Sequence, residues 1–279
     1  MSGTWHSPAP PDEVRLRPVG RLRAWLRGAL VAGMFLIATM LLLSLRLVER
    51  PLCGLRRPVT PWLALGVARA SLRVIGLRVV IRGRPMRARG AIVSNHVGWM
   101  DILVLMAVQR MFFVAKAEVG GWPGIGWMAR QAGTVFITRK GHAARHQKEL
   151  FEARLRAGHR LMFFPEGTST DGLRVLPFKS TLFEAFFTPG LKDFMHVQPV
   201  TLRYRPPAGA DPRFYGWWGD MAFGPHMLKV LAARRQGQVE VIFHPPVGVR
   251  DFEGRKALAR HCEATIRAEI PGGRDEDGA

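Results

Sequence analysis

The sequence predicts an α/β fold: a mixed, largely parallel sheet flanked by helices, with a membrane-embedded helical segment ahead of it. Two observations carry this prediction. Strand-like and helix-like stretches alternate between residues 77 and 270, which is typical of a single α/β domain. An uncharged run of 18 residues, 28–45, precedes that alternation. At 279 residues and 48% hydrophobic composition, the chain is large enough for one such domain with an appendage.

Residues 1–27 are expected to form a basic, flexible N-terminal segment. Four prolines fall within residues 1–20, among few large apolar groups, which is typical of a loose tail. Arginines precede the apolar run at positions 15, 17, 21, 23 and 27 and follow it at positions 46, 50, 56 and 57. Because both ends are basic, the distribution of positive charge does not orient a membrane span.

Residues 28–76 are expected to form a membrane-associated helical segment. As a helix, the run 28–45 would be roughly 27 Å long against a bilayer core of about 30 Å, so spanning the membrane and lying in it both stay open. Residues 61–74 are amphipathic, and the two stretches together predict a helical hairpin in the cytoplasmic face of the inner membrane. A cleaved signal peptide is the alternative, although no small-x-small cleavage site follows the run.

Residues 77–270 are expected to form the α/β domain. Short apolar runs predict strands at 77–81, 91–94, 111–115, 134–138, 160–164, 197–204 and 239–244. Helix-like stretches lie at 101–108, 142–157, 180–187, 221–233 and 255–270. Residues 271–279 are expected to form a flexible tail.

The formal net charge of +20 predicts attraction to an acidic partner, either nucleic acid or an anionic lipid surface. The arginines that flank the apolar run favour an anionic membrane surface over nucleic acid. The two cysteines, Cys53 and Cys262, form no CxxC pattern or Cys/His cluster. This argues against a disulfide framework and against a metal site, and it favours a reducing compartment.

Residues 95–101, with the sequence NHVGWMD, place a histidine five residues ahead of an aspartate just after a predicted strand. Strand ends are where α/β proteins place their chemistry, and a carboxylate that orients an imidazole produces a general base. His96 and Asp101 are therefore the candidate catalytic pair. Taken alone, a spacing of this kind is a weak signal.

Three further segments fall at or beside predicted strand ends: GTVFITR at 133–139, FFPEGT at 163–168 and VQPV at 197–200. In their order and spacing, the four segments resemble the glycerolipid acyltransferase family, whose members acylate glycerol phosphate and lysophosphatidate. The resemblance covers roughly residues 75–250, and four ordered motifs are far more specific than one. It implies transfer of a fatty acyl chain from an acyl carrier protein or coenzyme A thioester to the free hydroxyl of a lysolipid. The default acceptor is 1-acylglycerol-3-phosphate, and no cofactor beyond the thioester is implied.

The resemblance also implies a role for each matched residue. His96 would take the proton of the acceptor hydroxyl, and Asp101 would fix the tautomer of the imidazole, as carboxylates do in catalytic triads. Main-chain amides near Gly98 or Gly167 are candidate donors to the oxyanion of the tetrahedral intermediate. The matched residues expected to bind the acceptor are Arg139, Glu166, Gly167 and Thr168. Lys116, at the end of a predicted strand, is expected to add a second charge there, with a place in a solvated basic rim as the equal alternative.

One departure from the family pattern bears on the acceptor. The family usually continues from Glu-Gly-Thr with Arg-Ser, whereas Ser169 and Thr170 follow here. A phosphomonoester carries nearly two negative charges, so the missing guanidinium weakens the case for lysophosphatidate. The segment YGWWGDM at 215–221 resembles the branch of the family that includes bacterial lyso-ornithine-lipid acyltransferases, although an aromatic cluster at the membrane interface explains it equally well. Lyso-ornithine lipid is the alternative acceptor.

Other classes of protein fit less well. The segment GIGWMA at 124–129 matches a dinucleotide-binding fingerprint but does not directly follow a predicted strand. The chain contains no G-x-S-x-G, which counts against a serine hydrolase, and neither a Walker lysine loop nor H-E-x-x-H. The alternative to an enzyme is a non-enzymatic protein that binds a membrane surface or nucleic acid through its charge alone.

Overall fold

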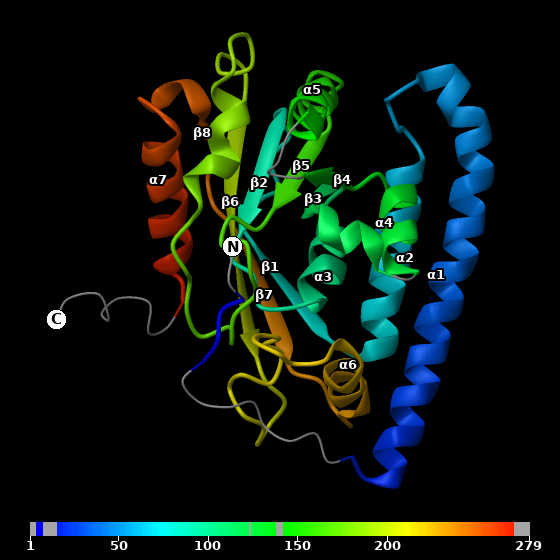
Figure 1. Ribbon diagram of the computed structural model, residues 1–279. Coiled ribbons are helices and arrows are strands. Elements are labelled where there is room, and N and C mark those ends of the chain that lie inside the picture. Colours follow the sequence, from blue (N-terminus) through cyan, green and yellow to red (C-terminus); the bar gives the residue numbers. More distant parts are fainter. Residues whose placement is uncertain (1–3, 8–15, 123, 138–141, 271–279) are drawn as a thin grey trace, which may run out of the picture.

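A computed structural model describes residues 4–7, 16–122, 124–137 and 142–270 (Figure 1). Its centre is an eight-stranded sheet in the order β1-β7-β6-β2-β5-β3-β4, with β8 paired to the start of β6. The strands are β1 Arg78–Arg82, β2 Gly90–Ser94, β3 Phe112–Lys116, β4 Val135–Ile137, β5 Arg160–Phe163, β6 His196–Arg205, β7 Gln238–Phe243 and β8 Val247–Gly248. Strand β6 pairs antiparallel with β7 and β8, and the other pairs are parallel. The expected mixed, largely parallel sheet is confirmed.

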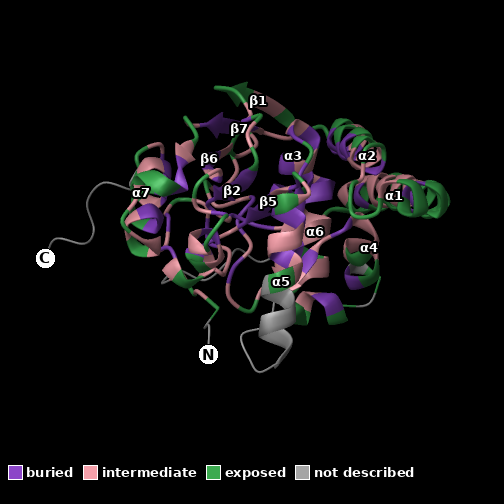
Figure 2. Cartoon of the chain, turned by 90° about the horizontal axis from the view of Figure 1, so that it is seen from above, coloured by how far each residue is buried: buried purple, intermediate pink, exposed green. Residues whose placement is uncertain are grey.

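Helices cover both faces of this sheet (Figures 1 and 2). The α-helices are α1 Pro18–Cys53, α2 Thr60–Ile75, α3 Met100–Val108, α4 Ile125–Ala132, α5 His142–Arg156, α6 Phe223–Ala232 and α7 Arg255–Arg267. Short 3-10 helices are η1 Ala117–Gly121, η2 Ser180–Phe187 and η3 Val249–Asp251. One apolar core joins α2, α3 and α6 to the sheet, and a second joins α5, η2 and α7 to its other face.

Strand β2 lies at the centre of the sheet and is buried on both faces. Ile92 faces the core beneath α2 and α3, whereas its neighbours Ala91 and Val93 face the core beneath α7. Burial on both faces is usual for a strand in a parallel sheet and explains why β2 is apolar throughout instead of alternating with polar residues. Because β2 ends at Ser94, residues 95–101 emerge at the middle of the sheet's carboxyl edge.

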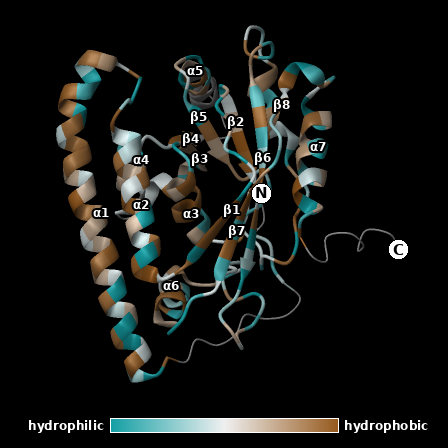
Figure 3. Ribbon diagram, turned by 180° about the vertical axis from the view of Figure 1, so that it is seen from behind, coloured by the Kyte–Doolittle hydropathy of each residue, from teal (hydrophilic) through white to brown (hydrophobic). Residues whose placement is uncertain are grey.

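Helices α1 and α2 lie side by side as a hairpin on the outside of the domain (Figure 3). Helix α1 is 36 residues long, and the outward side chains of its middle part, such as Leu36, Ile37 and Met40, are exposed although apolar. Among the described residues, α1 is the one helix long and apolar enough to cross a membrane. The apolar run 28–45 is therefore the middle of a helix twice its length.

The N-terminal part of α1 differs from expectation, because residues 18–27 were assigned to a flexible segment and are helical. Ala24 is fully buried against the core, and two arginines bind the C-terminal end of α6. The Arg23 guanidinium donates to the carbonyl of Ala232 (2.8 Å), and Arg27 donates to that of Ala233 (2.6 Å). The last carbonyls of a helix lack partners within the helix, so these guanidinium groups cap α6 and hold α1 in place.

Three smaller differences concern elements between the strands. Residues 180–187 form a 3-10 helix, α4 was not predicted, and the strand β8 was missed. A Cβ atom at Gly126 would overlap the main-chain oxygen of Gly120, so this glycine allows α4 to pack against η1. The predicted tail, 271–279, lies outside the described residues.

Candidate active site

The candidate catalytic pair lies where β2 gives way to α3. His96 is the second residue after β2, and Asp101 lies in the first turn of α3. The imidazole Nδ1 is 2.8 Å from Asp101 Oδ2. A buried carboxylate only accepts hydrogen bonds, so Nδ1 carries the proton and Nε2 carries the lone pair. This is the tautomer that a general base needs.

Asp101 is fully buried, and each of its oxygens is engaged. Oδ2 accepts from the amides of Val97 (2.7 Å) and Gly98 (3.0 Å) as well as from the imidazole. Oδ1 accepts from the hydroxyl of Tyr204 (2.8 Å), which lies on β6. The two amides of the loop before α3 and the hydroxyl compensate for burying the charge.

The His96 ring is held from the side by the segment that follows β5. It stacks on Phe164 with ring centroids 3.9 Å apart and an angle of 8° between the planes. The main-chain oxygen of His96 accepts from the amide of Thr170 (3.0 Å). About a fifth of the imidazole side chain is exposed, so one edge of the ring is open to a substrate.

Glu166 lies behind this segment and not at the surface of the site. Its side chain is 2% exposed, Oε1 accepts from the amide of His96 (2.7 Å), and Oε2 accepts from that of Leu176 (2.8 Å). Burial raises the pKa of its carboxyl to about 8, although the two amides lower it. Glu166 thus ties the catalytic loop to residues 165–176, and the role in acceptor binding that the resemblance implies remains a prediction.

The buried carboxyl of Glu166 makes stability depend on pH. Its pKa is about 8 in the folded chain and near 4.5 when exposed, so this contribution to stability is complete below about pH 4.5 and is lost as the pH rises through 8. The melting temperature of Glu166→Gln, followed from pH 5 to 9, should fall less steeply with pH than that of the wild type. Glu184→Gln, at an exposed glutamate, is the control and should follow the wild type. Equal slopes for all three proteins would contradict this assignment.

The remaining predicted residues are placed as follows. Gly167 adopts φ +72°, and a Cβ atom there would lie 2.6 Å from Lys179 Nζ, so the glycine brings a cation next to the Pro-Glu-Gly-Thr turn. Thr168 Oγ1 accepts from the amide of Trp5 (3.4 Å). Lys116 ends β3, and because β3 and β2 both run parallel to β5, it lies at the same edge of the sheet as His96. Arg139 lies outside the described residues.

Residues 4–7 contact the site, although they fall in the segment that was expected to be flexible. Besides Thr168, Trp5 contacts Trp218, with ring centroids 6.4 Å apart, and its carbonyl accepts from the amide of Gly219 (3.0 Å). The guanidinium of Arg174 lies 5.2 Å from the centre of the Trp5 ring. These contacts join the N-terminal segment to the Pro-Glu-Gly-Thr turn and to the tryptophans of segment 215–221.

The two candidate oxyanion donors are both engaged within the protein. The amide of Gly98 donates to Asp101, and that of Gly167 donates to the carbonyl of Phe164 (3.1 Å). Neither amide is directed at the open edge of the imidazole. The expectation that Gly98 or Gly167 serves the oxyanion is therefore not supported by the geometry.

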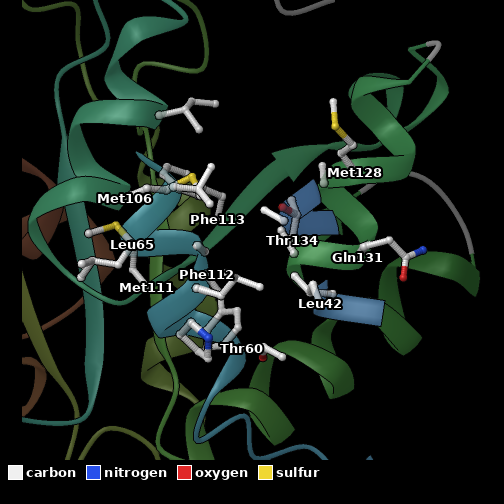
Figure 4. A pocket seen from close by; sticks show the side chains of 18 of the residues that line it. Leu42, Thr60, Leu65, Met106, Met111, Phe112, Phe113, Met128, Gln131 and Thr134 are labelled. Carbon is white, nitrogen blue, oxygen red and sulfur yellow. The ribbon is translucent and has the colours of Figure 1, made fainter. Parts of the chain in front are cut away.

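An apolar cavity of about 240 Å³ lies between the helical hairpin and the sheet (Figure 4). Side chains of α1, α2, α3, β3 and α4 line it, among them Leu42, Leu65, Met106, Phe113 and Met128. The ring of Phe113 is 6.5 Å from that of Phe164, which stacks on His96. One pair of aromatic rings therefore separates the cavity from the imidazole.

Three contributors to the site were missed by sequence reasoning: Tyr204, Phe164 and Trp5. The Tyr204 contact joins residues 103 positions apart, and the Trp5 contact joins residues 163 apart. No local pattern predicts such pairings. Phe164 could have been predicted, because it directly follows β5 and belongs to the FFPEGT segment at 163–168.

Known proteins match this chain over most of its length. The profile of the acyltransferase family matches residues 73–203. A lyso-ornithine lipid O-acyltransferase from Rhodobacter capsulatus is 53% identical over 264 residues, covering 95% of this chain and 96% of that protein. A 1-acyl-sn-glycerol-3-phosphate acyltransferase from Neisseria gonorrhoeae is 34% identical over 215 residues, covering 75% of this chain and 80% of that protein.

A solved structure shares the fold. The 1-acyl-sn-glycerophosphate acyltransferase of Thermotoga maritima superposes with a TM-score of 0.57 at 21% identity, covering 92% of this chain and all of that one. The family profile spans the segments that carry His96, Asp101 and Glu166, and the relative from Rhodobacter capsulatus matches over nearly its whole length. The chain belongs to the acyltransferase family.

Proposed function

We propose that this protein transfers a fatty acyl chain from an acyl carrier protein or coenzyme A thioester to the free hydroxyl of lyso-ornithine lipid. The observation that carries the proposal is the hydrogen bond of 2.8 Å between His96 and the fully buried Asp101. The alternative that the protein acts through its charge alone has no use for such a pair, and it is set aside because the family consists of enzymes.

The proposed reaction needs one base and no covalent enzyme intermediate. His96 Nε2 takes the proton of the acceptor hydroxyl while its oxygen attacks the thioester carbonyl. Asp101 stabilises the imidazolium that forms. Collapse of the tetrahedral intermediate breaks the carbon–sulfur bond, and the thiolate leaves with the proton held by the imidazolium. The apolar cavity beside Phe113 offers a place for an acyl chain.

Two observations favour lyso-ornithine lipid over 1-acylglycerol-3-phosphate, the default acceptor. Relatives named lyso-ornithine lipid O-acyltransferase match at 53%, 42%, 35% and 31% identity, and those named for 1-acylglycerol-3-phosphate match at 34%, so the strongest matches carry the former name. Ser169 and Thr170, which stand where the family usually has Arg-Ser, bond to the carbonyls of Trp217 and His96. These two positions therefore serve the protein's own loops and supply no charge to a phosphate.

A parallel assay tests the acceptor. The purified protein receives labelled acyl donor with either lyso-ornithine lipid or lysophosphatidate in mixed micelles, and the ratio of kcat/KM values is measured. We expect a preference of at least about tenfold for lyso-ornithine lipid, because a site without the guanidinium lacks a strong partner for a phosphomonoester. A preference for lysophosphatidate would overturn the proposed acceptor and would leave the acyl-transfer chemistry standing.

The proposed location is the cytoplasmic face of the inner membrane. The exposed apolar side chains of α1 supply a surface for the hydrocarbon region. The exposed arginines near the two ends of α1 supply partners for anionic headgroups; they are Arg17, Arg21, Arg50 and Arg56. A catalytic domain held against the membrane by this hairpin would meet a lysolipid without extracting it into water.

A further inference from the structure

We propose that Tyr204 is a positioning residue for catalysis, whose hydroxyl fixes the Asp101 carboxylate so that one of its oxygens faces the imidazole of His96. The inference rests on the proposed role of His96 as the base. Nothing in the motifs of the sequence points to this residue, since it lies on β6 beyond the VQPV segment.

The geometry gives the two carboxylate oxygens separate tasks. Oδ2 receives the imidazole and two amides, all from the loop that carries His96. Oδ1 receives only the Tyr204 hydroxyl among the described residues, at 2.8 Å. A carboxylate turns readily about its terminal bond. The hydroxyl therefore opposes rotation of the carboxylate away from His96.

Tyr204 can hold this position because β6 is the neighbour of β2 in the sheet. The two strands pair in parallel from Gly90 and His196 to Ser94 and Val200. The side chain of Asn95 continues this link, because its oxygen accepts from the amide of Leu202 (2.8 Å) and its nitrogen donates to the carbonyl of the same residue (2.9 Å). Tyr204 lies two residues after Leu202 on β6, so the bonds between Asn95 and Leu202 fix its position relative to β2, the strand that leads to His96.

The hydroxyl of Tyr204 stays protonated near neutral pH and therefore remains a donor. Burial and the charge of Asp101 both raise the pKa of Tyr204 well above its ordinary value of 10. Four other titratable groups face this cluster. Glu166 lies behind His96, and the positive charge of Arg267 on α7 lowers the pKa of Glu166. The ring of Tyr215 packs with its centroid 5.1 Å from that of Tyr204. His226 of α6 accepts a hydrogen bond from the indole of Trp99. All four are unchanged in a variant that removes only the Tyr204 hydroxyl.

The pH dependence of such a variant separates positioning from mere support of the fold. Without the phenol, the negative charge of Asp101 is less neutralised and stabilises the imidazolium form of His96 more strongly. The base must be neutral to act, and the acid limb of the kcat profile therefore moves to higher pH. A hydroxyl that supported only the packing of β6, without acting on the Asp101 carboxylate, would change the melting temperature and leave the limb in place.

The first experiment compares Tyr204→Phe with Tyr215→Phe, a matched control whose hydroxyl bonds to Gln236 and Gly237, away from the catalytic pair. Tyr204→Phe should lower kcat about tenfold to a hundredfold, leave the acceptor KM within about twofold, and move the acid limb up by about one pH unit. The control should keep the wild-type limb. An unmoved limb in Tyr204→Phe would overturn the inference.

A double-mutant cycle with Asp101→Asn asks whether Tyr204 acts through that carboxylate. In the Asp101→Asn background, Tyr204→Phe should cost less than about twofold in kcat, because the two changes remove one unit. Equal losses in both backgrounds would overturn the inference. His96→Ala distinguishes the failures: if that variant remains active, the proposed function fails, whereas loss of activity in His96→Ala with additive effects at Tyr204 refutes only the positioning role.

A spectroscopic test does not depend on the activity of the variant. The chain has two tyrosines, so Tyr215→Phe protein grown with 3-fluorotyrosine carries the fluorine at position 204 alone. Its ¹⁹F resonance should move when Asp101→Asn is introduced and also when His96→Ala is introduced. A ¹⁹F chemical shift that stays the same in both variants would show that the Tyr204 hydroxyl is not coupled to His96 and Asp101.

Discussion

Replacing His96 with alanine is expected to reduce acyl transfer by at least about a thousandfold while the protein keeps its fold. The variant loses the nitrogen that takes the hydroxyl proton, and no other described group lies within hydrogen-bonding distance of Asp101 in a position to replace it. The cost to folding is small, because Asp101 Oδ2 keeps the amides of Val97 and Gly98. The measurement is kcat with labelled acyl donor and lysolipid, next to circular dichroism and the melting temperature.

His261→Ala is the matched control for this variant. His261 lies on α7, on the opposite face of the sheet from α3, and is exposed. Its replacement should leave kcat within about twofold of the wild type, as is usual for a surface substitution. Activity of His96→Ala above about a tenth of the wild type would contradict the role of the imidazole.

The second large effect concerns Gly90, the first residue of β2. Its φ is +151°, and a Cβ atom there would overlap the carbonyl oxygen of His196 and lie 2.8 Å from the carbonyl carbon. Gly90→Ala forces β2 away from β6 at the start of their pairing, and β2 is the strand that leads to His96. Steric overlap and an unfavourable backbone conformation together should cost about 3–5 kcal/mol of unfolding free energy.

The melting temperature tests this expectation, with a fall of about 10 °C for Gly90→Ala. Gly66→Ala is the control, because Gly66 lies inside α2 with nothing within 4 Å of the added methyl group. Removing a glycine from a helix interior should stabilise the protein by roughly 0.5–1 kcal/mol. A loss below about 1 kcal/mol for Gly90→Ala would show that the strands can separate without cost.

Seven of the eight strands could be predicted, because each is a compact apolar run that ends at a turn, whereas the two-residue strand β8 is too short to leave such a pattern. The limits of α1 could not. The arginines at positions 23 and 27 have the composition of a solvated tail, and their partners on α6 lie more than 200 residues away. Their role as caps depends on packing that no local pattern records.

The candidate site divides in the same way. His96 and Asp101 are five residues apart and meet across one turn, so their spacing alone predicts the contact. Glu166 was recognised from its motif, but the direction of its side chain was not predicted. A carboxylate between a strand end and a turn can point into the protein or toward the substrate, and here it points inward, to the amides of His96 and Leu176. Tyr204 escaped prediction because only the pairing of β2 with β6 brings it to Asp101.

The central claim is that His96 transfers a proton directly and that no acyl group is held on the protein. The most direct measurement follows a radiolabelled acyl chain from acyl carrier protein or coenzyme A, with and without lyso-ornithine lipid, after an acid quench. We expect label in the diacyl lipid, none on the protein, and no labelled product with His96→Ala. Label bound covalently to the protein that later passes to the acceptor, or undiminished product from His96→Ala, would contradict the central claim.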